Sequence, residues 1–295
     1  MVCNVFLRDR LELESSILGP GSIPPRATKN LNSPLVGLFS FRAWQGANIP
    51  PMNILKLLLI SACYLALVQN SSYADELIKD QLIETAHYEN GDVIPYMLTV
   101  KESTKVRYVL IIMPGGVGYL DPELRDGKVW FKAAGNFLIR SRALFVDSES
   151  VVISTNSTGS PERMMAIIDD ASKRYANSKV FIIGTSRSTI STMRLAEKLD
   201  GKVAGFIHTA SMGGISRFDT RKLISRQLIV HHKDDGCRLT PYGAAESNQE
   251  DYGTLLITME GGIAQGDPCE AFGYHGFNGI EKETVNKIKS WIKVS

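Results

Sequence analysis

The stretch Val180-Phe181-Ile182-Ile183-Gly184-Thr185-Ser186-Arg187-Ser188-Thr189 decides the fold. Its four apolar residues predict a buried strand and the residues at 190–199 predict a helix, so a Gly-x-Ser-x-small turn joins strand to helix. Small residues at Gly184 and Ser188 permit the close backbone approach that such a tight turn needs. The hydroxyl of Ser186 would then be exposed beside the free N–H groups of a helix N-terminus, which suits a nucleophile.

A nucleophilic serine needs a base and an orienting acid, and after a turn of this kind the acid and then the base follow along the chain. The chain has five histidines. His275 is the last of them and lies in the loop 272–277, just before a predicted helix at 282–293. Because Gly273 and Gly276 flank it closely, the loop can bring its imidazole over the edge of a sheet. We therefore expect His275 to be the base.

The acid should follow a strand that lies between the serine and the base. The stretch at 228–237 contains an apolar run that ends in Asp234 and Asp235, at the edge of the sheet where such sites are built. Either carboxylate is a candidate. His231 and His232 end the strand itself and are expected to be structural, because the base must come after the acid.

Acyl transfer also needs donors that stabilise negative charge on a carbonyl oxygen, each worth about 3–4 kcal/mol. A predicted strand at 109–113 leads into the glycine-rich segment at 114–118. On this segment the N–H of Gly116 is the expected donor, with Val117 as a neighbouring candidate, and the N–H of Arg187 is the expected second donor. The segment lacks Gly-Lys-Ser/Thr and Gly-x-Gly-x-x-Gly patterns, which disfavours a nucleotide site, and we expect no cofactor.

These pieces, in this order from about Val106 to the C-terminus, resemble the α/β-hydrolase superfamily. Four strings look more narrowly like a group of bacterial exported α/β-hydrolases whose substrate is not settled: Met113-Pro114-Gly115-Gly116, Asn136-Phe137-Leu138-Ile139-Arg140-Ser141-Arg142, Gly184-Thr185-Ser186-Arg187-Ser188 and Asp267-Pro268-Cys269-Glu270-Ala271. The resemblance implies a serine hydrolase of ester-like bonds that works through a Ser-His-Asp triad and an acyl-enzyme. It also implies Asp235 as the acid, since hydrolases with a His-x-x-x-Asp string use its last residue, and Asp234 remains the alternative.

Two residues depart from the commonest superfamily pattern. Pro114 stands where lipases and esterases often have histidine, and Ser188 stands where glycine is usual. Neither change removes a catalytic group. Because folds host many functions, a catalytically silent binding protein on the same scaffold is the second hypothesis. The presence of serine, acid and base in sequence argues against it.

Residues 52–74 have the pattern of a secretory signal peptide. A short basic segment at 52–56 precedes an apolar stretch at 57–68, and Ser72-Tyr73-Ala74 is a small-x-small cleavage site before Asp75. The apolar stretch is shorter than the roughly 20 residues that span a bilayer. We expect a periplasmic or secreted protein without stable membrane insertion after cleavage.

The segment at 1–51 shows no sustained helical or strand period. We expect it to be a gene start placed too early, with translation from Met52, or a disordered extension. In the second case the apolar stretch would serve as an uncleaved anchor. A lipoprotein signal ending at Cys63 competes poorly, because the apolar run continues past this cysteine.

The chain has four cysteines, and cleavage after Ala74 leaves Cys237 and Cys269. If Asp235 and His275 meet in a site, these cysteines come close as well, since each lies near one of the two residues. An oxidising compartment permits a disulfide between them. A zinc site is disfavoured because no Cys-x-x-Cys or His-x-x-x-His pattern accompanies them, and no metal is expected.

Short Val- and Ile-rich runs alternate with helical stretches through residues 75–295, which predicts one α/β domain with a mostly parallel central sheet and helices on both faces. An N-terminal β-hairpin is expected around Asn90-Gly91. Helices are expected at 132–145 and 161–175 among others, with no large lid. The formal net charge of +2 gives no argument for a nucleic-acid partner. The expected partner is a small ester-like substrate.

Overall fold

The structure is a computed structural model that describes residues 78–88, 90–101 and 105–294. The predicted signal peptide at 52–74 and the segment at 1–51 lie outside these residues, and both stay predictions. No helix among the described residues combines the length and the apolar character that crossing a membrane requires.

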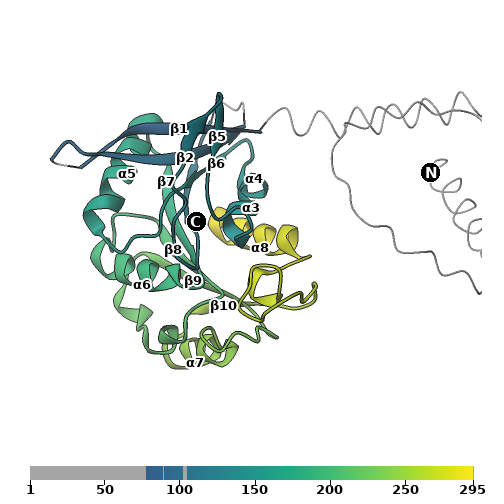
Figure 1. The fold of residues 1–295 in the computed structure, drawn as a ribbon. Helices are drawn as coiled ribbons and strands as arrows, with labels where there is room; N and C mark the ends of the chain where they lie inside the picture. Colours follow the sequence, from purple (N-terminus) through teal and green to yellow (C-terminus); the bar gives the residue numbers. More distant parts are fainter. Residues whose placement is uncertain (1–77, 89, 102–104, 295) are drawn as a thin grey trace, which may run out of the picture. The chain divides into compact units, whose positions relative to one another are not determined.

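Eight strands form one sheet in the order β1-β2-β6-β3-β7-β8-β9-β10 (Figure 1). They are β1 (Ile78–His87), β2 (Val93–Lys101), β3 (Tyr108–Met113), β6 (Ser150–Ser154), β7 (Lys179–Thr185), β8 (Gly205–Thr209), β9 (Arg226–His232) and β10 (Leu255–Met259). The pairs β1–β2 and β2–β6 are antiparallel, and all other neighbours in the sheet are parallel. The predicted, mostly parallel sheet that begins with a hairpin is confirmed.

Helices cover both faces of the sheet, as the alternation of strands and helices predicts. Figure 1 shows α5 (Pro161–Arg174) and α6 (Ser188–Lys198) on one face, with α3 (Phe137–Arg140), α4 (Arg142–Phe145) and α8 (Glu281–Lys293) on the other. The buried apolar residues divide accordingly. In β3, Val109 and Ile111 pack in the cluster that contains residues of α5 and α6, whereas Leu110 and Ile112 pack in the cluster with α3, α4 and α8. Because β3 is covered on both faces, its sequence reads as one continuous apolar run.

The single helix predicted at 132–145 is wrong. Ala133 has a φ of +56°, which ends any helix at this point, and the chain turns before Asn136. The Asn136 side chain then accepts a hydrogen bond from the N–H of Leu138 at 3.1 Å and caps α3. Ser141 separates α3 from α4, so the segment forms two short helices.

Three elements were not predicted. A small hairpin of β4 (Glu123–Arg125) and β5 (Lys128–Trp130) lies between β3 and α3, and α7 (Tyr242–Tyr252) lies between β9 and β10.

Between β8 and β9 the chain makes only short 3-10 turns, η1 (Gly213–Arg217) and η2 (Thr220–Lys222), so no inserted lid follows β8.

Three parallel strands end at the same edge of the sheet and lead into the segments predicted to carry function. β3 runs into the glycine-rich segment at 114–118, β7 runs into Ser186, and β9 runs into Asp235. Because these strands lie near one another in the sheet, the topology gathers the three segments at one place.

Candidate active site

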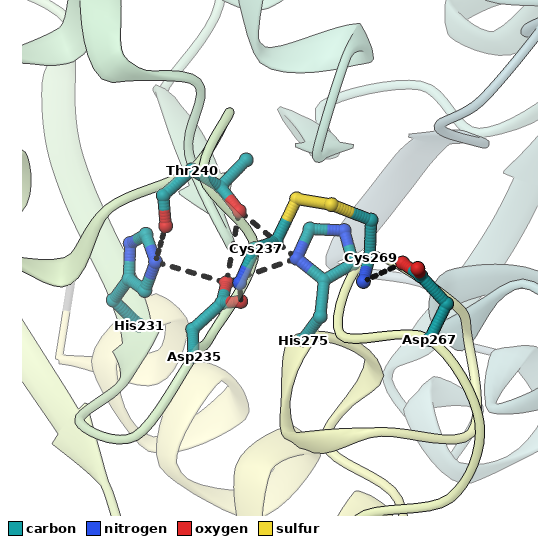
Figure 2. The surroundings of a disulfide bond; sticks show 7 residues. All are labelled: His231, Asp235, Cys237, Thr240, Asp267, Cys269 and His275. Carbon is teal, nitrogen blue, oxygen red and sulfur yellow. Dashed lines mark hydrogen bonds and ion pairs between the residues drawn. A yellow bond between two sulfur atoms is a disulfide. The ribbon is translucent and has the colours of Figure 1, made fainter.

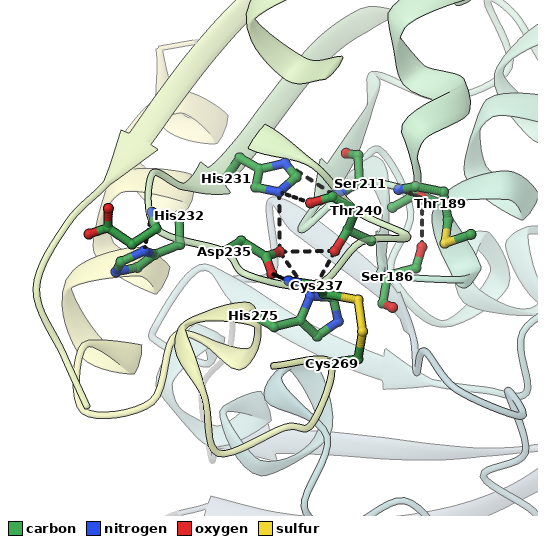
Figure 3. A network of polar contacts seen from close by, with 12 residues as sticks. Ser186, Thr189, Ser211, His231, His232, Asp235, Cys237, Thr240, Cys269 and His275 are labelled. Atoms are coloured by element: carbon green, nitrogen blue, oxygen red, sulfur yellow. Dashed lines mark hydrogen bonds and ion pairs between the residues drawn. A yellow bond between two sulfur atoms is a disulfide. The ribbon is translucent and has the colours of Figure 1, made fainter. Parts of the chain in front are cut away.

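Ser186 lies in the turn between β7 and α6 with a φ of +54°, a region that non-glycine residues rarely adopt. The surrounding backbone holds it there. Its N–H donates to the carbonyl of Thr209 at 3.0 Å, and its own carbonyl accepts from the N–H and the hydroxyl of Thr189 at 2.9 and 2.6 Å. The Ser186 side chain is partly exposed, at the edge where β7 ends (Figure 3).

Ser188 is a structural part of this turn. Its Oγ accepts from the N–H of Thr185 at 2.7 Å and lies 2.9 Å from the carbonyls of both Met113 and Thr185, which share its single proton. The residue is only 1% exposed, so its hydroxyl is not available to a substrate. The same hydroxyl links the end of β7 to the end of β3 and thereby joins the serine turn to the glycine-rich segment.

Two glycines permit the close packing of this region. A Cβ at Gly184 would lie 2.7 Å from the Cγ2 of Thr192, and a Cβ at Gly115 would lie 2.9 Å from the Cβ of Ser186. Gly115 therefore rests directly against the serine. The next residue, Gly116, has a φ of +64° and begins a turn in which the N–H of Gly118 donates to the carbonyl of Gly115 at 3.1 Å.

The two predicted oxyanion donors are the residues that follow the Gly115–Ser186 contact on each segment: Gly116 comes after Gly115, and Arg187 comes after Ser186. Within the described residues, the N–H groups of Gly116 and Arg187 make no hydrogen bond to another protein group. Val117, the neighbouring candidate, is largely exposed. Free backbone donors next to a nucleophile are the groups that can stabilise a developing oxyanion.

The structure joins Asp235 to His275 and leaves Asp234 apart. The Oδ2 of Asp235 and the Nδ1 of His275 lie 2.9 Å apart, although the residues are 40 positions apart in the chain. Both residues are buried. Asp234 is exposed, and among the described residues its carboxylate has no hydrogen-bond partner, while its N–H donates to the Nδ1 of His232 at 3.0 Å. Of the two aspartates, Asp235 is the one in contact with the imidazole.

Four donors surround the Asp235 carboxylate. Besides His275, its Oδ2 lies 3.2 Å from the Nε2 of His231 and accepts from the hydroxyl of Thr240 at 3.0 Å, while its Oδ1 accepts from the N–H of Cys237 at 2.9 Å. Burial by itself raises the pKa of Asp235, but the hydrogen bonds from His231, His275 and Cys237 and the charge of His275 together lower the pKa well below its usual range. The carboxylate is therefore ionised at neutral pH.

Thr240 also assigns the proton of the imidazole. Its hydroxyl proton goes to Asp235, so the hydroxyl oxygen can only accept from the Nδ1 of His275, which lies 3.1 Å away. The proton of neutral His275 is therefore on Nδ1, between the two oxygens. Its Nε2 then carries the lone pair that a general base needs.

The described residues contain no hydrogen bond between the Oγ of Ser186 and the imidazole of His275. In the view of Figure 3 the His275 ring lies between Asp235 and Ser186. Contacts between nucleophile and base are often long in free enzymes and shorten when substrate binds.

The predicted disulfide is present. Cys237 and Cys269 are bonded with a sequence separation of 32, and Figure 2 shows the bond beside the Asp235–His275 pair. It ties the turn after β9 to the loop that carries His275. The N–H of Cys269 in turn donates to the Asp267 carboxylate at 2.9 Å.

The loop at 260–280 that carries His275 has one short 3-10 turn, η3 (Tyr274–Gly276), and depends on side chains from elsewhere. The guanidinium of Arg140 donates to the carbonyl of Gly276 at 2.7 Å and to the carboxylate of Glu281 at 2.9 Å. A second anchor is His232, whose Nε2 lies 2.7 Å from the carbonyl of Gly261 and whose ring stacks on that of Tyr274.

In the part of the chain that the structure describes, no group of three or more His, Cys, Asp or Glu side chains could hold a metal ion.

Known proteins resemble this chain in structure and not in sequence. No protein-family model and no curated protein matches it. Among solved structures, Est1E from Butyrivibrio proteoclasticus matches with a TM-score of 0.50 at 13% identity, over 72% of this chain and 97% of that one. An esterase domain from a Rhodothermus marinus protein matches at 0.49 and 12% identity, over 72% and 97%. XC6422 from Xanthomonas campestris, described as an α/β serine hydrolase without lid, matches at 0.47 and 12%, over 71% and 94%.

The chain has the α/β-hydrolase fold. Its serine turn lies directly after a central parallel strand, the place that this fold gives to a nucleophile, and the candidate residues Asp235 and His275 follow it along the chain. The resemblance inferred from the sequence is confirmed at the level of the fold. With the fold established, Pro114 and Ser188 are the two places where the α/β-hydrolase pattern of this chain is unusual, and Ser188 has the structural role described above.

Sequence reasoning missed two contributors to the candidate site. Thr240 touches both Asp235 and His275, and the N–H of Ser211 donates to His231 at 3.3 Å. A threonine or a serine in a loop carries no pattern of its own. The one available signal was the spacing of His231 four residues before Asp235, which puts two titratable groups on one strand end.

Proposed function

We propose that this chain is a serine hydrolase that cleaves ester-like bonds of a small or medium substrate, with Ser186 as nucleophile, His275 as base and Asp235 as acid. The observation that carries the proposal is the hydrogen-bonded Asp235–His275 pair beside a serine on a strained strand-to-helix turn. A binding protein has no need for a buried carboxylate that holds an imidazole in the basic tautomer. The unused N–H groups of Gly116 and Arg187 add to the argument.

In the proposed reaction, the Nε2 of His275 takes the proton of Ser186 as its Oγ attacks the carbonyl carbon. The resulting oxyanion accepts hydrogen bonds from the N–H groups of Gly116 and Arg187. Asp235 stabilises the imidazolium, which then gives its proton to the leaving alcohol as the acyl-enzyme forms. Water then attacks the acyl carbon while His275 takes its proton, and the imidazolium returns that proton to the Oγ of Ser186 as the carboxylic acid leaves.

Esters and thioesters should react at this site faster than amides do, because an alcohol or a thiol is a better leaving group than an amine. The short turns between β8 and β9 put no inserted lid over Ser186, which supports access for small and medium substrates.

Two comparisons test the assignment. Ser186→Ala should abolish hydrolysis of p-nitrophenyl acetate and labelling by a fluorophosphonate, a loss on the order of 10⁴ or more. Its thermal midpoint should stay near that of the wild type, since the described residues give the Ser186 hydroxyl no hydrogen bond. Asp235→Asn should be far more damaging than Asp234→Asn, because only Asp235 contacts His275. A wild-type protein that is neither labelled nor active would instead indicate a silent binding protein.

We also propose that the protein is exported, with cleavage after Ala74. The disulfide between Cys237 and Cys269 supports this, because such bonds persist in oxidising compartments. Intact-mass analysis of the protein recovered from a periplasmic or secreted fraction should give a chain that begins at Asp75. A mature chain that keeps Met1 in a membrane fraction would contradict the proposal.

A further inference from the structure

His231 is a buried titratable residue that the proposed triad does not use. It is the second-last residue of β9, four residues before Asp235, and its side chain is fully buried. Its Nε2 faces two oxygens, the Oδ2 of Asp235 at 3.2 Å and the carbonyl of Thr240 at 3.0 Å. The Oδ2 that it contacts is the same oxygen that holds His275.

The backbone determines which nitrogen of His231 carries the proton. The N–H of Ser211, at the end of β8, donates to the Nδ1 of His231 at 3.3 Å. Because a backbone N–H can only donate, this nitrogen must have its lone pair free. Neutral His231 therefore carries its proton on Nε2, where both neighbouring oxygens are acceptors. The N–H is thus shared between Asp235 and Thr240.

We infer that His231 is a positioning residue for the proposed triad, which holds the Asp235 carboxylate in the orientation that His275 requires and moderates the charge that the imidazole experiences. This inference rests on the proposed serine-hydrolase function. Figure 3 shows His231 and His275 on different sides of Asp235, so the carboxylate is clamped between two imidazoles. Thr240 links the two residues, because its hydroxyl donates to Asp235 and its carbonyl accepts from His231.

Few other charged or titratable groups face this cluster. From α7, the ring of Tyr242 lies edge-on to His231 at 5.9 Å between centroids. From α3, Arg140 reaches the carbonyl of Gly276, next to His275, while its charge is paired with Glu281. Asp234 lies on the exposed side of the turn after β9. His231 is therefore the group whose N–H acts most directly on the Asp235 charge.

A matched pair of variants separates positioning from packing. In His231→Gln the side-chain amide reaches the place of Nε2 and keeps a donor toward Asp235, whereas in His231→Asn the amide reaches only the place of Nδ1 and can serve Ser211 alone. The assay is p-nitrophenyl acetate hydrolysis across pH, with fluorophosphonate titration to count competent sites. Wild-type activity and Ser186→Ala serve as controls for the proposed function itself.

We expect His231→Gln to keep kcat within a few-fold of the wild type. His231→Asn should lose roughly 10- to 100-fold in kcat per titrated site with little change in KM, since a misplacement near 1 Å costs about 100-fold. In His231→Asn more of the Asp235 charge acts on the imidazolium, so the acid limb of the kcat/KM profile should move to higher pH by about half a unit.

The outcomes are decisive in both directions. Equal kcat and superimposable pH profiles for both variants, in an active wild-type background, would overturn the inference while leaving the proposed function intact. If His231→Asn does not fold, His231→Met, which is similar in size and lacks a donor, takes its place. If His231→Asn and His231→Met, which both lack a donor toward Asp235, fail to fold while His231→Gln folds and is active, the role of His231 is purely structural and the inference is wrong. An inactive wild type would instead refute the proposed function.

Discussion

Replacing Cys237 and Cys269 together by alanine separates the contribution of the disulfide to the fold from its contribution to the site. The bond has a sequence separation of 32 residues, and a loop of this length gives about 3.7 kcal/mol at 25 °C in the chain-entropy relation. We therefore expect the free energy of unfolding to fall by about 3–4 kcal/mol. A domain of this size can lose that much and stay folded at 25 °C if its stability is typical.

The loss of activity in this double variant should be larger than the fraction of protein that unfolds. The loop at 260–280 has one 3-10 turn, so side-chain contacts hold His275 in place once the bond is gone. Two of them survive in the variant, the bond from Arg140 to the carbonyl of Gly276 and the stacking of His232 on Tyr274. The base should therefore drift without leaving the site, and kcat/KM should fall by roughly 10- to 100-fold.

The assay compares urea unfolding, followed by circular dichroism, with ester hydrolysis at 25 °C in the absence of urea. Reduction of the wild-type protein should reproduce the loss of activity, and the same reductant should leave the alanine variant unchanged. If activity falls only in proportion to the unfolded fraction, the bond has no local role in the site. A change in unfolding free energy below about 1 kcal/mol would contradict the entropic estimate.

Three further perturbations follow from particular contacts. Burial lowers the pKa of His208 to about 4, against 6.5 for the free side chain. Below pH 6.5 the unfolded chain binds a proton at His208 that the folded chain does not. The free energy of unfolding should therefore fall by about 1.4 kcal/mol for each unit that the pH is lowered, down to about pH 4. Urea titrations of His208→Gln should lack this slope. Ser188→Gly leaves the buried N–H of Thr185 without its acceptor and should cost about 1–3 kcal/mol in urea unfolding. Arg140→Lys cannot reach Gly276 and Glu281 at once and should lower kcat more than it lowers the thermal midpoint.

The strands were predictable because their burial is complete. β3 is buried at every residue and reads as an unbroken apolar run, whereas β8 is equally buried although it ends in His208 and Thr209. By contrast, α7 has few apolar residues and no helical period. It is held by Ala245 in the core and by Asn248, whose amide donates to the carbonyls of Ile215 and Phe218 at 2.6 and 2.9 Å. Such contacts depend on the position of another loop, which no local pattern encodes.

The candidate site also contains residues that the sequence could predict and residues that it could not. Ser186, Asp235 and His275 each follow a recognisable element and keep a fixed order along the chain, so their positions could be inferred. Thr240 could not, because its role depends on the turn that brings its hydroxyl within 3.0 Å of Asp235 and 3.1 Å of His275. The tautomer of His231 depends on a backbone N–H that lies 20 residues earlier.

The two halves of the site are held by different means, and this determines where activity should be lost first. Ser186 is fixed by backbone hydrogen bonds and lies between β7 and α6, both regular elements of the core. Asp235 follows β9 directly and is held by four donors. His275 alone depends on a long loop and on contacts from distant segments. Local opening of that loop costs less than unfolding the sheet, so loss of the base should precede loss of the fold under any mild perturbation.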